Sequence, residues 1–243
     1  MDIYALIIIS MFVGYLVGSI PFALIVGKLF YKTDVRKFGS KNLGSANVGR
    51  TLGPVAGFLC LFFDVVKGGL PALLMYNIAE KILLDTHPEQ LIYLSIVYCV
   101  TGFFTSLGHC HPCFANFSGG KAVACICGFL LFSNFKLWVA ALIGFLIVFI
   151  ISRIVSLSSI GSAIVVMIAQ FIPFFKEPTI FKYNELFPSL INSELPLFIY
   201  NITITLLAIL LIYRHISNIR KLIKGEEKKF SFGKVNKVAE NEK

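Results

Sequence analysis

Charged side chains are scarce in this sequence: Asp, Glu, Lys and Arg together make up 14% of its 243 residues. Hydrophobic residues make up 57%, and the mean hydropathy is +0.82. So few charges exclude a soluble globular domain as the fold of this chain. The sequence also lacks low-complexity tracts and internal repeats, direct or inverted, and such repeats are typical of solenoids and of many transporters.

Long apolar runs are present instead. A membrane-spanning helix needs about 20 predominantly apolar residues. The sequence therefore predicts an all-α, polytopic integral membrane protein with about seven transmembrane helices, six or eight being left open, in one membrane-embedded domain over residues 1–243. Asp2 stands where a signal peptide carries basic residues, so we do not expect the first run to be cleaved. The candidate spans are Ile3–Val26, Gly53–Ala79, Leu91–Leu107, Lys121–Phe132, Leu137–Ile151, Ser156–Phe171 and Leu195–Tyr213.

Basic residues concentrate in alternate connections between these spans. Residues 28–50 carry six basic residues and one acidic residue, and the tail 214–243 carries nine and four, whereas the connections 80–90 and 173–194 are net acidic. The positive-inside rule then predicts an N-terminus outside and a cytoplasmic tail, with Lys136 the one basic residue on the wrong side. The net charge of +9 is explained by this topology and by contact with anionic membrane lipid. A nucleic-acid partner is not expected, because separate loops share the basic groups.

Six cysteines raise the question of metal or thiol chemistry. Four of them lie inside apolar runs, where cysteine behaves as a small hydrophobic residue. Cys110 and Cys113 form a C-x-x-C motif flanked by His109 and His111, which is compatible with a metal or redox site. Because no second ligand pair accompanies them, we expect no metal and no cofactor, and a role for this pair is left open.

The first inward segment, residues 39–50, combines glycines, serines and asparagines with a basic residue. This composition predicts a folded loop rather than a helix. Ser40 and Ser45 offer hydroxyl groups, Asn42 and Asn47 offer amides, and Arg50 offers a planar guanidinium suited to phosphate. The alternative is a solvated basic loop that only obeys the positive-inside rule.

The next inward segments repeat this chemistry. Gly119 and Gly120 permit a close backbone approach to a ligand, and Lys121 adds a charge at the start of a predicted helix, although a plain turn is the alternative. Ser156, Ser158 and Ser159 begin another helix, and His215 and Asn218, three residues apart, leave the last one. Serines in membrane helices often bond their own backbone, and a basic juxtamembrane stretch is often only a lipid-contact signal. Asp64 and Lys67 can pair within the second span, where the favoured role is to lock the bundle.

Several motifs occur in order across most of the chain: GSIP at residues 18–21, GSKNLGSANVGR at 39–50, DVVKG at 64–68, and G-H-x-x-P-x-F-x-x-F-x-G-G-K-x-V-A at 108–124. SLSSI at 156–160 and H-x-x-N-I-x-x-L-x-x-G-x-E at 215–227 follow. With these motifs the chain resembles the PlsY family, the bacterial acyl-phosphate:glycerol-3-phosphate acyltransferases. It departs from the family pattern at Ser45-Ala46, where the family commonly has Ala-Thr, at Ala122 and Cys125, where glycine and threonine are common, and at Ile216, where arginine is usual.

The resemblance implies a seven-helix enzyme of the inner membrane that works at its cytoplasmic face. It would transfer an acyl group from acyl phosphate to the sn-1 hydroxyl of glycerol 3-phosphate, giving lysophosphatidic acid and phosphate in the first acylation step of phospholipid synthesis. We expect these two substrates and membrane lipid as partners of a monomer. By family analogy, Ser40, Arg50, Gly119, Gly120 and Lys121 hold the acyl phosphate, and Asn42, Ser156, Ser158, Ser159, His215 and Asn218 receive the glycerol phosphate.

The sequence has no H-x-x-x-x-D motif and no spacing that suggests a Ser-His-Asp triad. We therefore expect an oxygen of the donor phosphate to take the hydroxyl proton, with Arg50 and Lys121 stabilising negative charge. An organophosphate transporter is the alternative function, and it is disfavoured because the polar groups gather at one face.

Overall fold

The computed structural model describes residues 1–176, 178 and 194–231, and every regular element within them is a helix. Most of the predicted outer loop 173–194 and the end of the basic tail, 232–243, lie outside the described residues. Each predicted span coincides with a helix or a helix pair. The helices are α1 (Ile3–Gly18), α2 (Phe22–Tyr31), α3 (Ser45–Leu52), α4 (Pro54–Thr86), α5 (Leu94–Cys110), α6 (Val123–Ser133), α7 (Phe135–Ser152), α8 (Val155–Ala169), α10 (Leu195–Arg214) and α11 (Ile216–Ile223), with short 3-10 turns at Val35–Lys37, Pro88–Tyr93, Cys113–Ala115 and Pro173–Phe175.

Five helical stretches of the described chain are long and apolar enough to cross a membrane: residues 3–31, 54–86, 88–115, 135–152 and 195–214. The apolar helices α6 and α8 are shorter, with 11 and 15 residues. The first span breaks between α1 and α2 at Pro21, whose ring favours an extended preceding residue. The helical membrane architecture is confirmed, and the number of spans and their orientation stay predictions.

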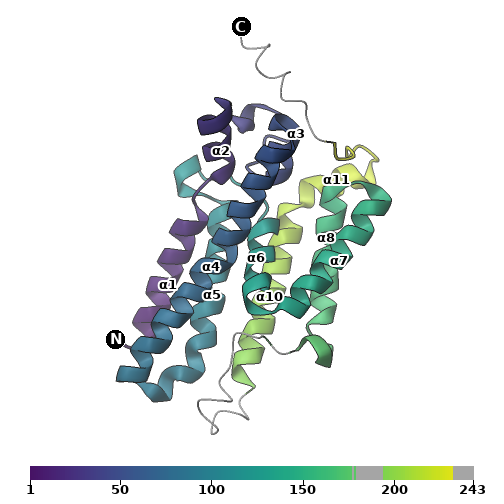
Figure 1. The fold of residues 1–243 in the computed structure, drawn as a ribbon. Coiled ribbons are helices and arrows are strands. Elements are labelled where there is room, and N and C mark those ends of the chain that lie inside the picture. Colours follow the sequence, from purple (N-terminus) through teal and green to yellow (C-terminus); the bar gives the residue numbers. More distant parts are fainter. Residues whose placement is uncertain (177, 179–193, 232–243) are drawn as a thin grey trace.

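The bundle has two parts joined through α6 and α10 (Figure 1). In one part α1 packs along α5, and α4 packs along α5 and α6; in the other α7 packs along α8, while α10 contacts both α5 and α8. A Cβ atom at Gly68 or Gly69 of α4 would collide with the backbone of α6. Small residues therefore bring α4 and α6 into close contact, as in other membrane helix pairs.

The chain reverses at each end of these helices, so the inward segments of the sequence meet at one end of the bundle. We call this the polar end, formed by residues 19–53, 111–122, 153–154 and 215–231. Figure 1 shows α2, α3 and α11 there, with the N-terminus at the opposite end. The main apolar core lies farther from the polar end, where Tyr98, Phe129 and Tyr200 pack their rings together.

Candidate active site

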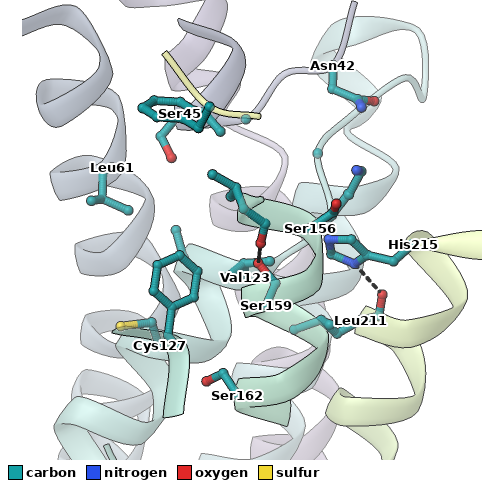
Figure 2. A pocket seen from close by; sticks show the side chains of 18 of the residues that line it. Asn42, Ser45, Leu61, Val123, Cys127, Ser156, Ser159, Ser162, Leu211 and His215 are labelled. Atoms are coloured by element: carbon teal, nitrogen blue, oxygen red, sulfur yellow. Dashed lines mark hydrogen bonds between the residues drawn. The ribbon is translucent and has the colours of Figure 1, made fainter. Parts of the chain in front are cut away.

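A cavity of about 900 Å³ opens at the polar end and continues into the bundle. Its polar part is lined by α3 and the loop before it, by the Gly119-Gly120 turn, and by α8 and α11; Figure 2 shows Asn42, Ser45, Ser156 and His215 there. Its apolar part runs between α4, α6, α7, α8 and α10. The cavity thus joins a polar chamber to an apolar limb. The predicted site residues that line it are Ser40, Asn42, Ser45, Arg50, Gly120, Lys121, Ser156, Ser159, His215 and Asn218.

Two predicted site residues stand behind the cavity wall. Gly119 is buried where a Cβ atom would strike the backbone carbonyl groups of His109 and Cys110. Ser158 is fully buried, and its hydroxyl donates to the carbonyl of Ile154 at 2.9 Å. Neither Gly119 nor Ser158 lines the cavity, so the contacts of both residues stabilise the fold.

The prediction of a folded loop over residues 39–50 is wrong for its second half, which forms α3. Glycine, serine and asparagine favour turns, but Gly49 lies where a Cβ atom on Gly57 of α4 would touch it, so small residues serve helix packing here. The buried Asn47 amide holds the remaining loop: its oxygen accepts from the Ser40 amide at 2.7 Å, and its nitrogen donates to the carbonyl of Val35 at 3.0 Å. The loop and helix together form one wall of the polar chamber.

Arg50 projects from the last turn of α3 into the chamber. It forms no ion pair within the described part of the chain, and its guanidinium lies 5.3 Å from the centre of the Phe230 ring. Burial lowers the pKa of Arg50, and the charge of Glu227 opposes this effect. Arginine stays protonated in proteins, so the chamber holds a cation with which no described carboxylate forms an ion pair.

The Gly119-Gly120 turn and Lys121 form the opposite wall. The Gly120 amide donates to the carbonyl of His109 at 3.0 Å, and the Gly120 carbonyl accepts from the Arg214 guanidinium at 3.0 Å. Lys121 Nζ donates to Asn218 Oδ1 at 2.5 Å. Burial, followed by the repulsion of Arg50, Arg214 and Lys221, lowers the pKa of Lys121 to about 8, although Glu227 acts in the other direction. A second cation therefore faces the chamber, and its protonation is sensitive to pH near 8.

Ala122 marks one departure from the family pattern. Its φ is +60°, in the left-handed region, and it stands as the N-cap of α6. A residue with a Cβ atom rarely adopts this conformation, whereas glycine does so freely. The glycine common at this position in the family suits the turn better than the alanine present here.

The remaining donors come from α8 and α11. The carboxylate Oε1 of Glu227 accepts from Ser156 Oγ and from Asn218 Nδ2, both at 2.7 Å. The His215 Nδ1–H donates to the Leu211 carbonyl at 2.8 Å, which leaves Nε2 as the acceptor of the neutral ring. Burial and the nearby Lys121 charge lower the pKa of His215 to about 4. Ser159 bonds its own helix at the Val155 carbonyl, the alternative that the sequence left open.

Glu227 was missed as a site residue, although it closes the last sequence motif. Its neighbours 226–231 also line the cavity, and the Phe230 amide donates to the Arg153 carbonyl at 2.7 Å, so this segment crosses the polar end. The motif H-x-x-N-I-x-x-L-x-x-G-x-E carried the signal, because it ends at Glu227. The hydrogen-bond partner of Glu227 could not be predicted from the sequence, because Ser156 and Glu227 are 71 residues apart.

A buried ionic cluster lies beneath the glycine turn. Lys67 Nζ is 2.8 Å from Asp64 Oδ1 and donates to the Ile20 carbonyl at 2.8 Å, which confirms the predicted pair. His109 Nδ1 is 3.5 Å from the same carboxylate oxygen, and the three side chains are no more than 6% exposed. A Cβ atom on Gly120 would overlap the His109 ring. The cluster thus ties α4, α5 and the glycine turn together, and Asp64 and His109 reach the cavity wall.

The polar chamber carries charges and donors that favour an anionic ligand. Arg50 and Lys121 supply positive charge, and the hydroxyl groups of Ser40 and Ser45 are further donors on the same lining. Low-dielectric surroundings strengthen such contacts. Within the described residues, no group of three or more His, Cys, Asp or Glu side chains is arranged to hold a metal ion, and Cys110 and Cys113 are free thiols.

Known proteins resemble this chain over most of its length. A sequence model of the family described as glycerol-3-phosphate acyltransferase matches residues 8–225. The chain is 38% identical over 226 residues to glycerol-3-phosphate acyltransferase 2 of Bacillus cereus, which covers 93% of this chain and 96% of that protein. It is 34% identical over 233 residues to glycerol-3-phosphate acyltransferase 2 of Lactobacillus acidophilus, covering 96% and 94%.

Solved structures show the same architecture. The crystal structure of PlsY, an integral membrane glycerol 3-phosphate acyltransferase, in its glycerol 3-phosphate form superposes with a TM-score of 0.72 at 29% identity, covering 93% of this chain and 96% of that chain. Its lysophosphatidic acid form superposes with a TM-score of 0.71 at 28% identity, covering 93% and 95%.

Proposed function

The chain belongs to the glycerol-3-phosphate acyltransferase family, and from this premise we propose that it transfers a fatty acyl group from acyl phosphate to the sn-1 hydroxyl of glycerol 3-phosphate. The products are lysophosphatidic acid and inorganic phosphate, in the first acylation step of bacterial phospholipid synthesis. One observation supports this most strongly: the chamber that carries Arg50 and Lys121 continues directly into an apolar limb. A lipid phosphate with a long tail matches this combination of surfaces.

The proposed chemistry needs no covalent enzyme intermediate. The glycerol hydroxyl oxygen attacks the acyl carbon, the bond from that carbon to the phosphate oxygen breaks, and phosphate leaves with the electron pair. An oxygen of the departing phosphate takes the hydroxyl proton, so the atoms and charges balance. Arg50 and Lys121 offset the repulsion between the two phosphates and the charge that develops on the leaving group.

The second substrate would lie against α8 and α11. Ser156, Asn218 and His215 converge there, and Glu227 accepts hydrogen bonds from the first two. His215 remains neutral at physiological pH because of its low pKa, so its Nε2 offers an acceptor to a glycerol hydroxyl. We propose these residues, with Asn42, as the glycerol phosphate site, and Ser40, Arg50 and Gly120–Lys121 as the acyl phosphate site.

The topology belongs to the same proposal. A basic polar end favours the cytoplasmic side of the bacterial inner membrane, with the N-terminus outside, seven spans and a monomeric single domain. Both water-soluble glycerol 3-phosphate and a membrane-dissolved acyl donor can then reach the cavity. Labelling that placed Arg50 and Lys121 on opposite sides of the membrane would refute the site.

The decisive experiment uses detergent-purified protein with acyl phosphate and glycerol 3-phosphate, and it measures release of inorganic phosphate and formation of lysophosphatidic acid. Release that depends on both substrates supports the enzyme, and replacing the donor with acyl-coenzyme A should abolish the formation of lysophosphatidic acid. Uptake of glycerol 3-phosphate into liposomes without acyl transfer would instead support transport. For the proton route, His109→Ala or His215→Ala with intact substrate binding and no turnover would replace the phosphate base with a histidine.

A further inference from the structure

The apolar limb of the cavity has a depth that matches one membrane leaflet. Along α7 its lining runs from Phe149 near the polar end to Trp138, through Phe145, Leu142 and Ala141. At 1.5 Å per helical residue this span is about 16 Å. Half of a bilayer core of about 30 Å is about 15 Å, so the limb has the length of one membrane acyl chain.

The limb ends at a packed wall. Its outermost lining residue on each of four helices is large and apolar: Leu130 on α6, Trp138 on α7, Val166 on α8 and Ile204 on α10. Leu130, Val166 and Ile204 belong to the main buried core, and the indole of Trp138 packs against that core. A chain that reaches this wall therefore meets close-packed side chains rather than open lipid.

Trp138 is the residue of this wall whose side chain is held by a hydrogen bond. Its indole Nε1–H donates to Cys127 Sγ at 3.1 Å, and its ring stacks on Phe135 with centroids 5.4 Å apart. Cys127 lies on the cavity lining of the neighbouring helix, as Figure 2 shows. Because a partly buried indole usually finds a partner for its N–H, these two contacts hold the ring in one orientation.

We propose that Trp138 ends the acyl site and sets the longest acyl chain that the enzyme accepts, with Cys127 as the residue that positions the indole. This inference rests on the proposed acyltransferase function. The limb also opens sideways, since the lining residues Phe58 and Leu61 of α4 are 68% and 40% exposed. That opening admits the tail from the bilayer, and the wall at Trp138 limits how far the tail end travels.

The first test compares kcat/KM for acyl phosphates with even chains of increasing length. Each methylene that finds room in an apolar site favours binding roughly fourfold. We compare two donors: the acyl phosphate that wild type prefers, and one whose chain is two carbons longer. The ratio of kcat/KM for the longer donor to kcat/KM for the preferred donor should be roughly tenfold higher in Trp138→Ala than in wild type. Trp138→Phe should give a smaller shift in the same direction. Phe198→Ala, which removes a 61% exposed ring from α10, should leave the profile unchanged.

Cys127 separates positioning from simple space filling. Cys127→Ser keeps an acceptor for the indole and should preserve the wild-type chain-length profile, whereas Cys127→Ala removes the acceptor and should broaden it. The two variants change the side-chain volume little, so a purely structural role would not distinguish them. Equal profiles for both would overturn the positioning role of Cys127.

The second test needs no substitution, because Trp138 is the only tryptophan in the chain. Lysophosphatidic acids that carry bromine at the tail end should quench its fluorescence once the chain is long enough to reach the wall, and shorter chains should not. If no donor supports acyl transfer, the proposed acyltransferase function is refuted, which is a different outcome from failure of the inference about Trp138. Acyl transfer with quenching independent of chain length, or with the same profile in Trp138→Ala, would overturn the inference and indicate a tail that leaves sideways into the bilayer.

Discussion

Replacement of Asp64 by Asn should strongly destabilise the protein, because Asp64 belongs to the buried ionic cluster beneath the glycine turn. The substitution keeps the side-chain volume but removes the charge that faces Lys67 Nζ at 2.8 Å, and the lysine is 4% exposed. An ammonium group left buried without its partner costs about 3–5 kcal/mol. Because folded domains are stable by about 5–15 kcal/mol, the loss is a large fraction of the total.

The control is the double variant Asp64→Asn/Lys67→Met, which removes both charges. It loses the hydrogen bond from Lys67 Nζ to the Ile20 carbonyl, worth about 0.5–1.5 kcal/mol, but leaves no uncompensated charge. Apolar replacement of buried ion pairs is often neutral or stabilising. The double variant should therefore be more stable than the single variant.

Thermal unfolding in detergent can be followed with a thiol-reactive dye, because Cys60, Cys99, Cys110 and Cys125 are buried and become accessible on unfolding. The single variant should unfold on the order of 10 °C below the wild type, and the double variant should recover most of that difference. A double variant as unstable as the single one would refute the assignment of the cost to an unpaired charge. A stable double variant that lacks activity would show that Asp64 also acts through His109 on the glycine turn.

Three further predictions concern the polar chamber. Arg50→Ala should lower kcat/KM by roughly 100- to 1,000-fold with an unchanged unfolding temperature. The control Arg36→Ala breaks an ion pair with Asp34 outside the cavity, and its kcat/KM should stay near that of wild type. Equal activities of the two variants would contradict the role of Arg50. The KM for the phosphate substrates should rise as the pH increases through about 8, because the buried Lys121 ammonium is charged below its lowered pKa and neutral above it. A KM that does not change between pH 7 and 9.5 would refute this, and so would an identical pH profile in Lys121→Arg. Gly120→Ala should lower the unfolding temperature clearly more than Gly44→Ala, because its Cβ atom overlaps a buried histidine ring while that of Gly44 meets nothing within 4 Å, and equal temperatures would refute the steric argument.

Much of the architecture was predictable because it depends on local composition. Apolar runs become helices in a membrane, since each backbone group must be satisfied within its own segment. The pairing of Asp64 with Lys67 was also predictable, because residues three apart share a helix face. The interpretation of residues 45–50 as loop was wrong for the opposite reason: the choice between a turn and a helix of small residues depends on the helix that packs against it.

The candidate site shows the same division. The sequence by itself determined which residue types are available at the polar end, and its motifs marked Arg50, Lys121 and Asn218. Only the tertiary structure decided that Lys121 meets Asn218 across 97 residues, that Ser156 rather than Ser158 faces the cavity, and that Glu227 bridges α8 and α11. These contacts depend on the relative rotation and depth of packed helices. Such geometry is set by the fit of many distant side chains, which no local pattern contains.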